Sequence, residues 1–250
     1  MTIVGTPAVE LRHVSKSFGS RRVLDDVSLS VDAGRSICIL GRSGTGKSVA
    51  LKHIVGLIHP DAGSVLIEGR DVTRLTGREL SRVRQRIGFL FQNAALFDSI
   101  CVGENVAFPL RRHTTLADAE IRSRASRLLA QVGLDREYDK MPADLSGGMQ
   151  KRAGLARALA LGPAILLADE PSAGLDPVTA GEIDALLVEL KHRSNTTLVV
   201  VTHNIPSARA IADELVFLHD GRIIEQGEPA AFDRSPVPLV RQFMMSEGAG

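Results

Sequence analysis

Apolar and polar residues alternate through much of the first third of the chain, which is the pattern of half-buried β-strands. VELRHV and VSLSV both have this period of two. Three further runs are short, apolar and bounded by glycine or polar residues, namely SICIL, GSVLIEG and IGFLFQ. We therefore expect a series of strands before residue 93, with SICIL as a buried one.

A glycine-rich segment, GRSGTGKS at residues 41–48, follows SICIL and leads into a helical pattern. Apolar residues in GKSVALKHIVGLI recur at helical spacing, and His59-Pro60 should end this helix. A strand, a glycine-rich loop and a helix in this order form the context in which such loops bind phosphate.

From Asn93 to about Leu161 the alternation gives way to helical periodicity. Thr115–Asp118 fits a capping box at the start of one helix, and Gly133 should end it. The apolar face of that helix comprises Ile121, Ala125, Leu128, Leu129 and Val132. A second helix should begin after Gly148 and run to Gly162-Pro163.

The last third of the chain returns to strands and helices in alternation. AILLADE and TTLVVVTH are typical of buried strands. Asp176-Pro177 supplies an N-cap and a first-turn proline for the helix between them, which should run through Lys191. DELVFLHDGRIIEQG has the pattern of a hairpin with Asp220-Gly221 at its turn.

Together these patterns predict an α/β core that is interrupted by a helical subdomain. The core comprises residues 1–92 and 162–250, and the inserted subdomain comprises residues 93–161. With 250 residues, 44% hydrophobic and 24% charged, the chain has the composition of an ordinary globular protein. A net charge of +1 gives no electrostatic footprint for nucleic acid, and charges interrupt the longest apolar stretch before it could span a membrane.

Residues 41–48 fit the phosphate-loop pattern G-x-x-x-x-G-K-[ST]. Glycines allow a tight turn in which several backbone N–H groups point at one phosphate. Lys47 would reach the β- and γ-phosphates of a nucleotide, and Ser48 would be a Mg²⁺ ligand. We expect nucleotide contacts from the whole loop and the next residue: Gly41, Arg42, Ser43, Gly44, Thr45, Gly46, Lys47, Ser48 and Val49.

Two carboxylates, Asp169 and Glu170, end the apolar run AILLADE. The carboxyl end of a central strand faces the same crevice as the phosphate loop. Asp169 suits the Mg²⁺ shell, directly or through water, and Glu170 is placed to polarise the attacking water. In isolation such a pair is more often a solvated strand end, and the phosphate loop upstream argues against that alternative.

His203 and Gln92 follow two other apolar runs and should reach the same edge of the sheet. A neutral His203 could hydrogen-bond to the γ-phosphate and the water while it orients Glu170. A structural cap is the alternative for His203, and we favour the catalytic role. Gln92 could contact Mg²⁺ or the water, or it could face solvent as a polar strand end, and strand-end geometry alone leaves both open.

These motifs occur in a fixed order, with LSGG at residues 145–148 between the loop and the carboxylates, and they resemble those of the ATP-binding-cassette (ABC) ATPases. The resemblance covers essentially the whole chain and includes Gln92, ILLADEP, SAGLD and His203. It implies a P-loop NTPase core of the RecA-like type, with an antiparallel β subdomain and an inserted α-helical subdomain. It also implies ATP and Mg²⁺ as cofactors, and ATP hydrolysis coupled to transport.

In that family two nucleotide-binding subunits pack head to tail, and each ATP lies between the phosphate loop of one and the LSGG signature of the other. By resemblance, Ser146, Gly147 and Gly148 would hold the γ-phosphate of ATP bound to a second copy. Asp176 would link the two sites across the interface. An upstream aromatic ring stacks on adenine in this family, and Phe18 fits that role, with a core phenylalanine as the alternative.

The segment after Gln92 narrows the resemblance. LFQNAALFDSICVGENVAFPLR and Met149 look like the cassettes of the Mla/Mce-type systems, which move phospholipid between the inner and outer membranes of bacteria. VRQF near the C-terminus is similar too, although the tail that follows, ending at Gly250, is shorter than in some members. The resemblance implies an ATPase subunit that maintains outer-membrane lipid asymmetry.

A cassette without a membrane span needs partners to move cargo. The resemblance implies a homodimer and an integral-membrane permease, which would dock in a groove near Gln92 to Asn105. It further implies an Mce-type lipid-binding protein, a small accessory subunit and a peripheral location on the cytoplasmic face of the inner membrane. One alternative is a cassette of another importer, for amino acids or similar solutes. A cassette acting on DNA or ribosomes is disfavoured, because the chain has neither a coiled-coil insertion nor a second fused cassette.

Overall fold

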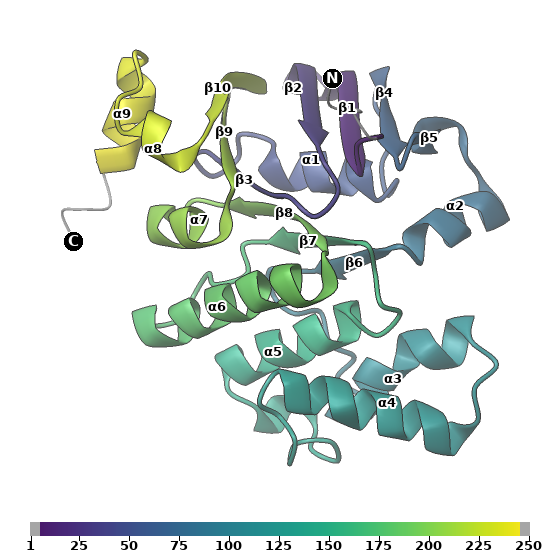
Figure 1. The fold of residues 1–250 in the computed structure, drawn as a ribbon. Helices are drawn as coiled ribbons and strands as arrows, with labels where there is room; N and C mark the ends of the chain where they lie inside the picture. The colour runs from purple at the N-terminus through teal and green to yellow at the C-terminus, as the bar shows by residue number, and fades with distance from the viewer. Residues whose placement is uncertain (1–5, 246–250) are drawn as a thin grey trace, which may run out of the picture.

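The computed structural model of the chain describes residues 6–245 and contains two sheets (Figure 1). The smaller sheet is antiparallel, in the order β2-β1-β4-β5. Its strands are β1 (Val9–Phe18), β2 (Arg21–Val31), β4 (Ala62–Ile67) and β5 (Arg70–Asp71). The end of the predicted short tail, residues 246–250, lies outside the described residues.

The larger sheet has the order β10-β9-β3-β8-β7-β6, and its neighbours are parallel except for the hairpin of β9 and β10. Its strands are β3 (Ser36–Leu40), β6 (Ile87–Leu90), β7 (Ile165–Asp169), β8 (Thr197–Thr202), β9 (Glu214–His219) and β10 (Arg222–Gly227). Asp220 and Gly221 both have positive φ, as a two-residue hairpin turn requires, so the predicted turn is confirmed.

Helices cover both faces of the larger sheet, and α3, α4 and α5 lie together at the end away from the smaller sheet (Figure 1). The helices are α1 (Lys47–Ile54), α2 (Gly77–Arg84), α3 (Val102–His113), α4 (Asp118–Gln131), α5 (Gly147–Ala158), α6 (Pro177–Ser194), α7 (Ile205–Ile211), α8 (Pro229–Phe232) and α9 (Pro238–Met245). Among residues 6–245, no helix combines the length and apolarity needed to cross a bilayer.

The central strands are buried on both faces, which explains their nearly continuous apolar sequences. Leu198 and Val200 of β8 face a core shared with α3–α7, whereas Val199 and Val201 face a core shared with α1 and the smaller sheet. This alternation follows from the two-residue period of a strand. The mixed α/β fold predicted from the sequence is therefore confirmed.

The insertion predicted at residues 93–161 falls in a stretch without strands. Between β6 and β7, all residues of which are described, the chain forms α3, α4, α5 and a short 3₁₀ helix at Pro142–Asp144. The predicted apolar face of α4 is buried apart from Leu128, which is half-buried. The subdomain boundaries themselves remain a prediction.

Three predicted helix boundaries were wrong, one of them the end of α5, which stops at Ala158 and does not reach Gly162-Pro163. Thr115 does not cap α4, which begins at Asp118 with Ala117 in the N-cap position and no side-chain cap. The preceding Thr114 instead closes α3 by donating its hydroxyl to the carbonyl of Leu110 (2.7 Å), so the next residues form a connection. Helix α1 ends at Ile54, well before His59-Pro60, because Gly56 adopts a left-handed conformation (φ 67°).

An ion pair connects α6 to the starts of β9 and β3 in the larger sheet. The Lys191 ammonium lies 2.6 Å from both carboxylate oxygens of Asp213, and Ser36 donates its backbone N–H to the same carboxylate (2.8 Å). Burial raises the pKa of Asp213, but the hydrogen bonds from Lys191 and Ser36 outweigh burial and hold that pKa below its ordinary value. The ionised pair therefore stabilises the fold.

Asp213→Asn should lower the free energy of unfolding by about 1–3 kcal/mol at neutral pH, because it removes a charge-assisted hydrogen-bond acceptor. A lowered pKa in the folded state contributes stability that is present above the unfolded pKa and is lost as pH falls through the folded value. The difference between wild type and variant should therefore shrink below about pH 4. Urea titrations at pH 7 and pH 3 measure it, with the exposed Asp135→Asn as control. An equal difference at both pH values would contradict the assignment.

Candidate active site

The phosphate loop passes close to neighbouring backbone at two of its glycines. Gly46 precedes α1 with φ 107°, and a Cβ there would lie 2.7 Å from the carbonyl oxygen of Val23. A Cβ at Gly41 would lie 2.3 Å from the carbonyl oxygen of Leu218. Both distances are too short for a side chain, so this loop requires glycine at the first and last glycine of the predicted pattern.

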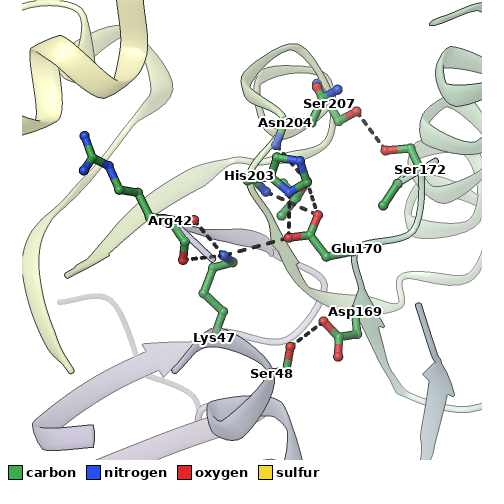
Figure 2. A network of polar contacts seen from close by, with 12 residues as sticks. Arg42, Lys47, Ser48, Asp169, Glu170, Ser172, His203, Asn204 and Ser207 are labelled. Atoms are coloured by element: carbon green, nitrogen blue, oxygen red, sulfur yellow. Dashed lines mark hydrogen bonds and ion pairs between the residues drawn. The ribbon is translucent and has the colours of Figure 1, made fainter. Parts of the chain in front are cut away.

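Lys47 places a buried ammonium inside the curve of the loop (Figure 2). Its Nζ donates to the carbonyl oxygens of Gly41 (2.6 Å) and Arg42 (3.1 Å), and it lies 3.8 Å from Oε1 of Glu170. Burial lowers the pKa of Lys47, while the charges of Glu170 and Asp169 partly oppose that shift. A partly desolvated cation in this place interacts more strongly with a phosphate than a solvated one would.

Ser48 and Asp169 bring two oxygen atoms together beside the loop. The Ser48 hydroxyl donates to Oδ1 of Asp169 at 2.8 Å (Figure 2). Burial is the main cause that raises the pKa of Asp169, and the hydrogen bond from Ser48 opposes it. A buried carboxylate of this kind is stabilised by a nearby cation, and hard oxygen donors suit Mg²⁺.

The described residues include no group of three or more His, Cys, Asp or Glu side chains that could hold a metal. A Mg²⁺ ion beside Ser48 and Asp169 would take most of its remaining ligands from the nucleotide phosphates and water, which is its usual mode of binding in phosphoryl-transfer sites. The residues present fit that mode.

Glu170 follows β7 and reaches the end of β8. Its carboxylate accepts hydrogen bonds from the hydroxyl of Thr202 (3.1 Å) and the backbone N–H of His203 (3.3 Å), and Nδ1 of His203 lies 2.9 Å from Oε1. Its backbone is left-handed (φ 49°), a rare conformation for glutamate. The predicted proximity of Glu170 and His203 is thus present, and Thr202 is an unpredicted partner that its position just before His203 could have suggested.

A cavity of about 380 Å³ opens beside the loop and collects most of the predicted site. Phe18 is half exposed, which rules out the core alternative, and Gln92 is exposed and lines the same cavity. Arg21, which sequence analysis missed, donates to the carbonyl of Gly44 (2.9 Å). The cavity is lined by Phe18, Arg21, Val23, Ser43, Gly44, Gly46, Lys47, Ser48, Val49, Gln92, Glu170 and His203.

Three loop residues lie outside that cavity. Gly41 contributes its carbonyl oxygen to Lys47, while Arg42 and Thr45 line a neighbouring cavity of about 420 Å³. The Thr45 hydroxyl donates to the carbonyl of Arg42 (2.9 Å), which stabilises the turn of the loop. Arg42 and Thr45 therefore shape the loop and line a different cavity from the one that Glu170 lines.

The LSGG signature and Asp176 lie at helix starts away from this cavity. Ser146 is the N-cap of α5 and accepts a hydrogen bond from the backbone N–H of Met149 (3.3 Å). Asp176 is the N-cap of α6, as predicted, and accepts from the N–H groups of Val178 and Thr179 (both 3.1 Å). Among the described residues that line the cavity, none belongs to residues 146–148. This separation is expected of groups that act on a second copy.

A phosphate loop and an acidic strand end that meet at the carboxyl edge of a parallel sheet define a P-loop ATPase. The ABC transporter family matches residues 24–173, and the chain belongs to this family. It is an ATP-binding, ATP-hydrolysing ABC cassette.

Solved structures support the same fold. The dimeric post-hydrolysis state of the ATP-binding cassette MJ0796 bound to ADP and Pi has a TM-score of 0.83 at 36% identity, and the alignment covers 88% of this chain and 98% of that one. CbiO1 from Clostridium perfringens, part of the transporter complex cbiONQ, has a TM-score of 0.81 at 28% identity over 97% of this chain and 99% of that one. The predicted P-loop core is confirmed.

The chain is similar to named proteins of two groups. The probable ribonucleotide transport ATP-binding protein Mkl of Mycobacterium leprae is 43% identical over 97% of this chain and 70% of its own length. The intermembrane phospholipid transport system ATP-binding protein MlaF is 42% identical in Escherichia coli K12, over 94% of this chain and 88% of its own length. MlaF of Haemophilus influenzae is 40% identical, over 97% of this chain and 92% of its own length. The predicted likeness to the Mla group is confirmed.

Glu170→Gln should retain ATP binding and lower the rate of hydrolysis by about 10²–10³-fold, because an amide cannot accept a proton from the attacking water. Phosphate release and nucleotide-binding titrations measure the two properties separately. Glu120→Gln, which alters an exposed carboxylate paired with Arg124, is the matched control and should turn over normally. Normal turnover by Glu170→Gln would show that another group activates the water.

Proposed function

We propose that this chain is the ATPase subunit of a phospholipid transporter, and that a dimer of it drives a separate permease that moves lipid between the inner and outer bacterial membranes. The observation that carries the cargo assignment is the similarity to MlaF, which extends over nearly the full length of both chains. The fold and the ATPase class do not depend on that assignment.

The chemistry we propose follows from the groups around the loop. Backbone N–H groups and Lys47 hold the β- and γ-phosphates, and Glu170 polarises the water that attacks the γ-phosphate. His203 hydrogen-bonds to that water and the γ-phosphate while it positions Glu170. Phe18 stacks on the adenine ring, and its exposed face on the cavity supports this role.

Ser48 and Asp169 would hold Mg²⁺, and Gln92, which lines the same cavity as Ser48, is a third candidate for the ion or the water. When bound, the ion supplies positive charge that neutralises the phosphates during hydrolysis. The protein contributes the two oxygen donors and a partly buried setting in which their charge interactions are strong.

We further propose that hydrolysis requires a head-to-tail homodimer. Ser146, Gly147 and Gly148 begin α5, where unpaired N–H groups and the helix dipole favour an anion. In their own chain they lie away from the loop cavity, so the anion they would hold is the γ-phosphate on a second copy. Asp176 would connect the two sites across that interface. The dimeric assembly of the MJ0796 cassette, which has the same fold, supports this arrangement.

Replacing Ser146 by Ala should lower hydrolysis by the assembled dimer about tenfold or more, because it removes a group that would contact the γ-phosphate in the closed state. Nucleotide binding to the isolated subunit should stay within about threefold of wild type. Both are measured on the purified chain, below and above the concentration at which it dimerises. Loss of binding in the isolated subunit would instead place Ser146 in its own chain's site.

An aromatic groove provides the surface we assign to the permease. It lies between β6 and the helices α3 and α5 and has a volume of about 340 Å³. Phe91, Phe97 and Phe108 expose 37%, 45% and 46% of their surfaces, and the rings of Phe97 and Phe108 are 4.9 Å apart. Exposed aromatic clusters of this kind are typical of protein-binding sites. Phe91 in the groove is adjacent to Gln92 in the nucleotide cavity, so binding of the permease in the groove can affect that cavity.

The names of the relatives point to two cargoes, phospholipid for MlaF and ribonucleotide for Mkl. We favour phospholipid, because the alignment covers more of MlaF than of Mkl. In this proposal the complex also contains an Mce-type lipid-binding protein and a small accessory subunit, and the chain lies at the cytoplasmic face of the inner membrane through its permease.

Isolation of the native membrane complex through a tag on this chain, followed by mass spectrometry of its proteins and lipids, tests the assignment. A lipid-binding partner and enriched phospholipid are expected, whereas an amino-acid-binding or nucleotide-binding partner would overturn the cargo. Phe108→Asp places a charge in the groove and should release the chain from the complex, while Leu57→Asp, at a different exposed apolar residue, should not. If the Phe108 variant stayed in the complex, the permease would bind at another surface of the chain.

A further inference from the structure

A tight turn follows the catalytic carboxylate. Ala173 donates its backbone N–H to the carbonyl oxygen of Glu170 (3.2 Å), which closes the turn Glu170–Ala173. Glu170 enters the turn in a left-handed conformation, and its own N–H donates to the carbonyl of Val201 (2.9 Å). A conformation of this kind persists only where the surroundings hold it, so the contacts of the turn determine where the carboxylate points.

Lys151 holds both ends of that turn. Its ammonium donates to the carbonyl oxygens of Glu170 (3.4 Å) and Ala173 (2.5 Å), across about twenty residues of sequence. The side chain is buried, with 7% of its surface exposed. Burial is the main cause that lowers the pKa of Lys151, and the charge of Glu170 opposes that shift. Burying an ammonium group costs free energy, which the hydrogen bonds to these two carbonyl oxygens partly offset.

Lys151 connects the turn to the helix that carries the LSGG signature. It lies on α5, the helix that begins at the LSGG signature, little more than one turn after the N-cap Ser146. The same turn is held from the other side by Ser172, whose hydroxyl lies 3.1 Å from that of Ser207 on α7 (Figure 2). With its middle tied to α7 and both ends tied to α5, the turn cannot stay in place if α5 shifts relative to β7.

We propose that Lys151 is a positioning residue, which couples the signature helix to the catalytic carboxylate through its hydrogen bonds to both ends of the Glu170–Ala173 turn. When α5 receives the γ-phosphate of a second copy, Lys151 transmits its displacement to the backbone of Glu170 and aligns the carboxylate with the water. One chain's signature thereby acts on two sites, through Ser146 on the second copy's ATP and through Lys151 on its own glutamate. The inference rests on the proposed roles of Glu170 and Ser146.

Lys151→Met tests the coupling, because methionine is an unbranched side chain of similar size without a donor or a charge. Turnover of the full chain should fall about 10–100-fold, the scale expected when a catalytic group is displaced by about 1 Å. The KM for ATP should stay within about threefold, since Lys151 does not line the nucleotide cavity. Lys151→Gln keeps an N–H donor and should recover most of the rate. Lys140→Met, the same change at a half-exposed lysine paired with Glu137, is the control.

A double-mutant comparison separates coupling from simple loss of packing. Ser146→Ala should reduce the rate by a smaller factor in the Lys151→Met background than in wild type, because the route through α5 is already cut. Equal factors in both backgrounds, or wild-type turnover by Lys151→Met, would overturn the inference. If Lys151→Met fails to fold in thermal melts, Lys151→Leu, which also lacks a donor, carries the same comparison with Ser146→Ala, and equal factors there overturn it too.

Glu170→Gln, assayed in parallel, distinguishes the two possible failures. Slow turnover by Glu170→Gln together with full turnover by Lys151→Met would overturn the coupling and leave the proposed function intact. Normal turnover by Glu170→Gln would remove the catalytic role of Glu170 itself, and with it the basis of the coupling.

Discussion

The parallel pairing of β3, β7 and β8 inside the molecule is the constraint on which the site depends. These strands are buried on both faces, so only the residues at their ends can reach a ligand. The carboxyl ends of the three strands meet at one edge of the sheet. That edge brings Lys47, Asp169, Glu170 and His203 together from three parts of the sequence. The cost of burying a lysine beside two carboxylates is offset because their opposite charges and hydrogen bonds are arranged before any nucleotide binds.

These residues could be placed from the sequence because Asp169, Glu170 and His203 end apolar runs and Lys47 belongs to the loop that follows one. The carboxyl ends of parallel strands meet at one edge of the sheet, so the four residues are expected together. Arg21 and Lys151 could not be found this way, since their contacts join segments that no local pattern relates. Thr115 shows the opposite failure. Its spacing to Asp118 matches a helix cap, but the end of α3 fixes the backbone just before it, so tertiary context overrides the local motif.

The two surfaces assigned to protein contacts, at the helix starts and at the aromatic groove, differ in chemistry. The signature and Asp176 are polar helix starts, suited to an anion or to a polar interface. The groove at Phe97 and Phe108 is aromatic and suited to a protein partner. Helix α5 contributes to both, with Ser146 at its start and Arg157 near its end in the groove. One rigid helix thus spans the distance between the proposed dimer contact and the proposed permease contact.

The left-handed backbone of Glu170 has a consequence for how this protein can evolve. Glycine or asparagine adopts that conformation at lower cost than glutamate, so either would relieve local strain and favour the folded state. The same replacements would remove the carboxylate from the end of β7. With the catalytic role proposed for Glu170, position 170 is a site where selection for stability and selection for turnover oppose each other.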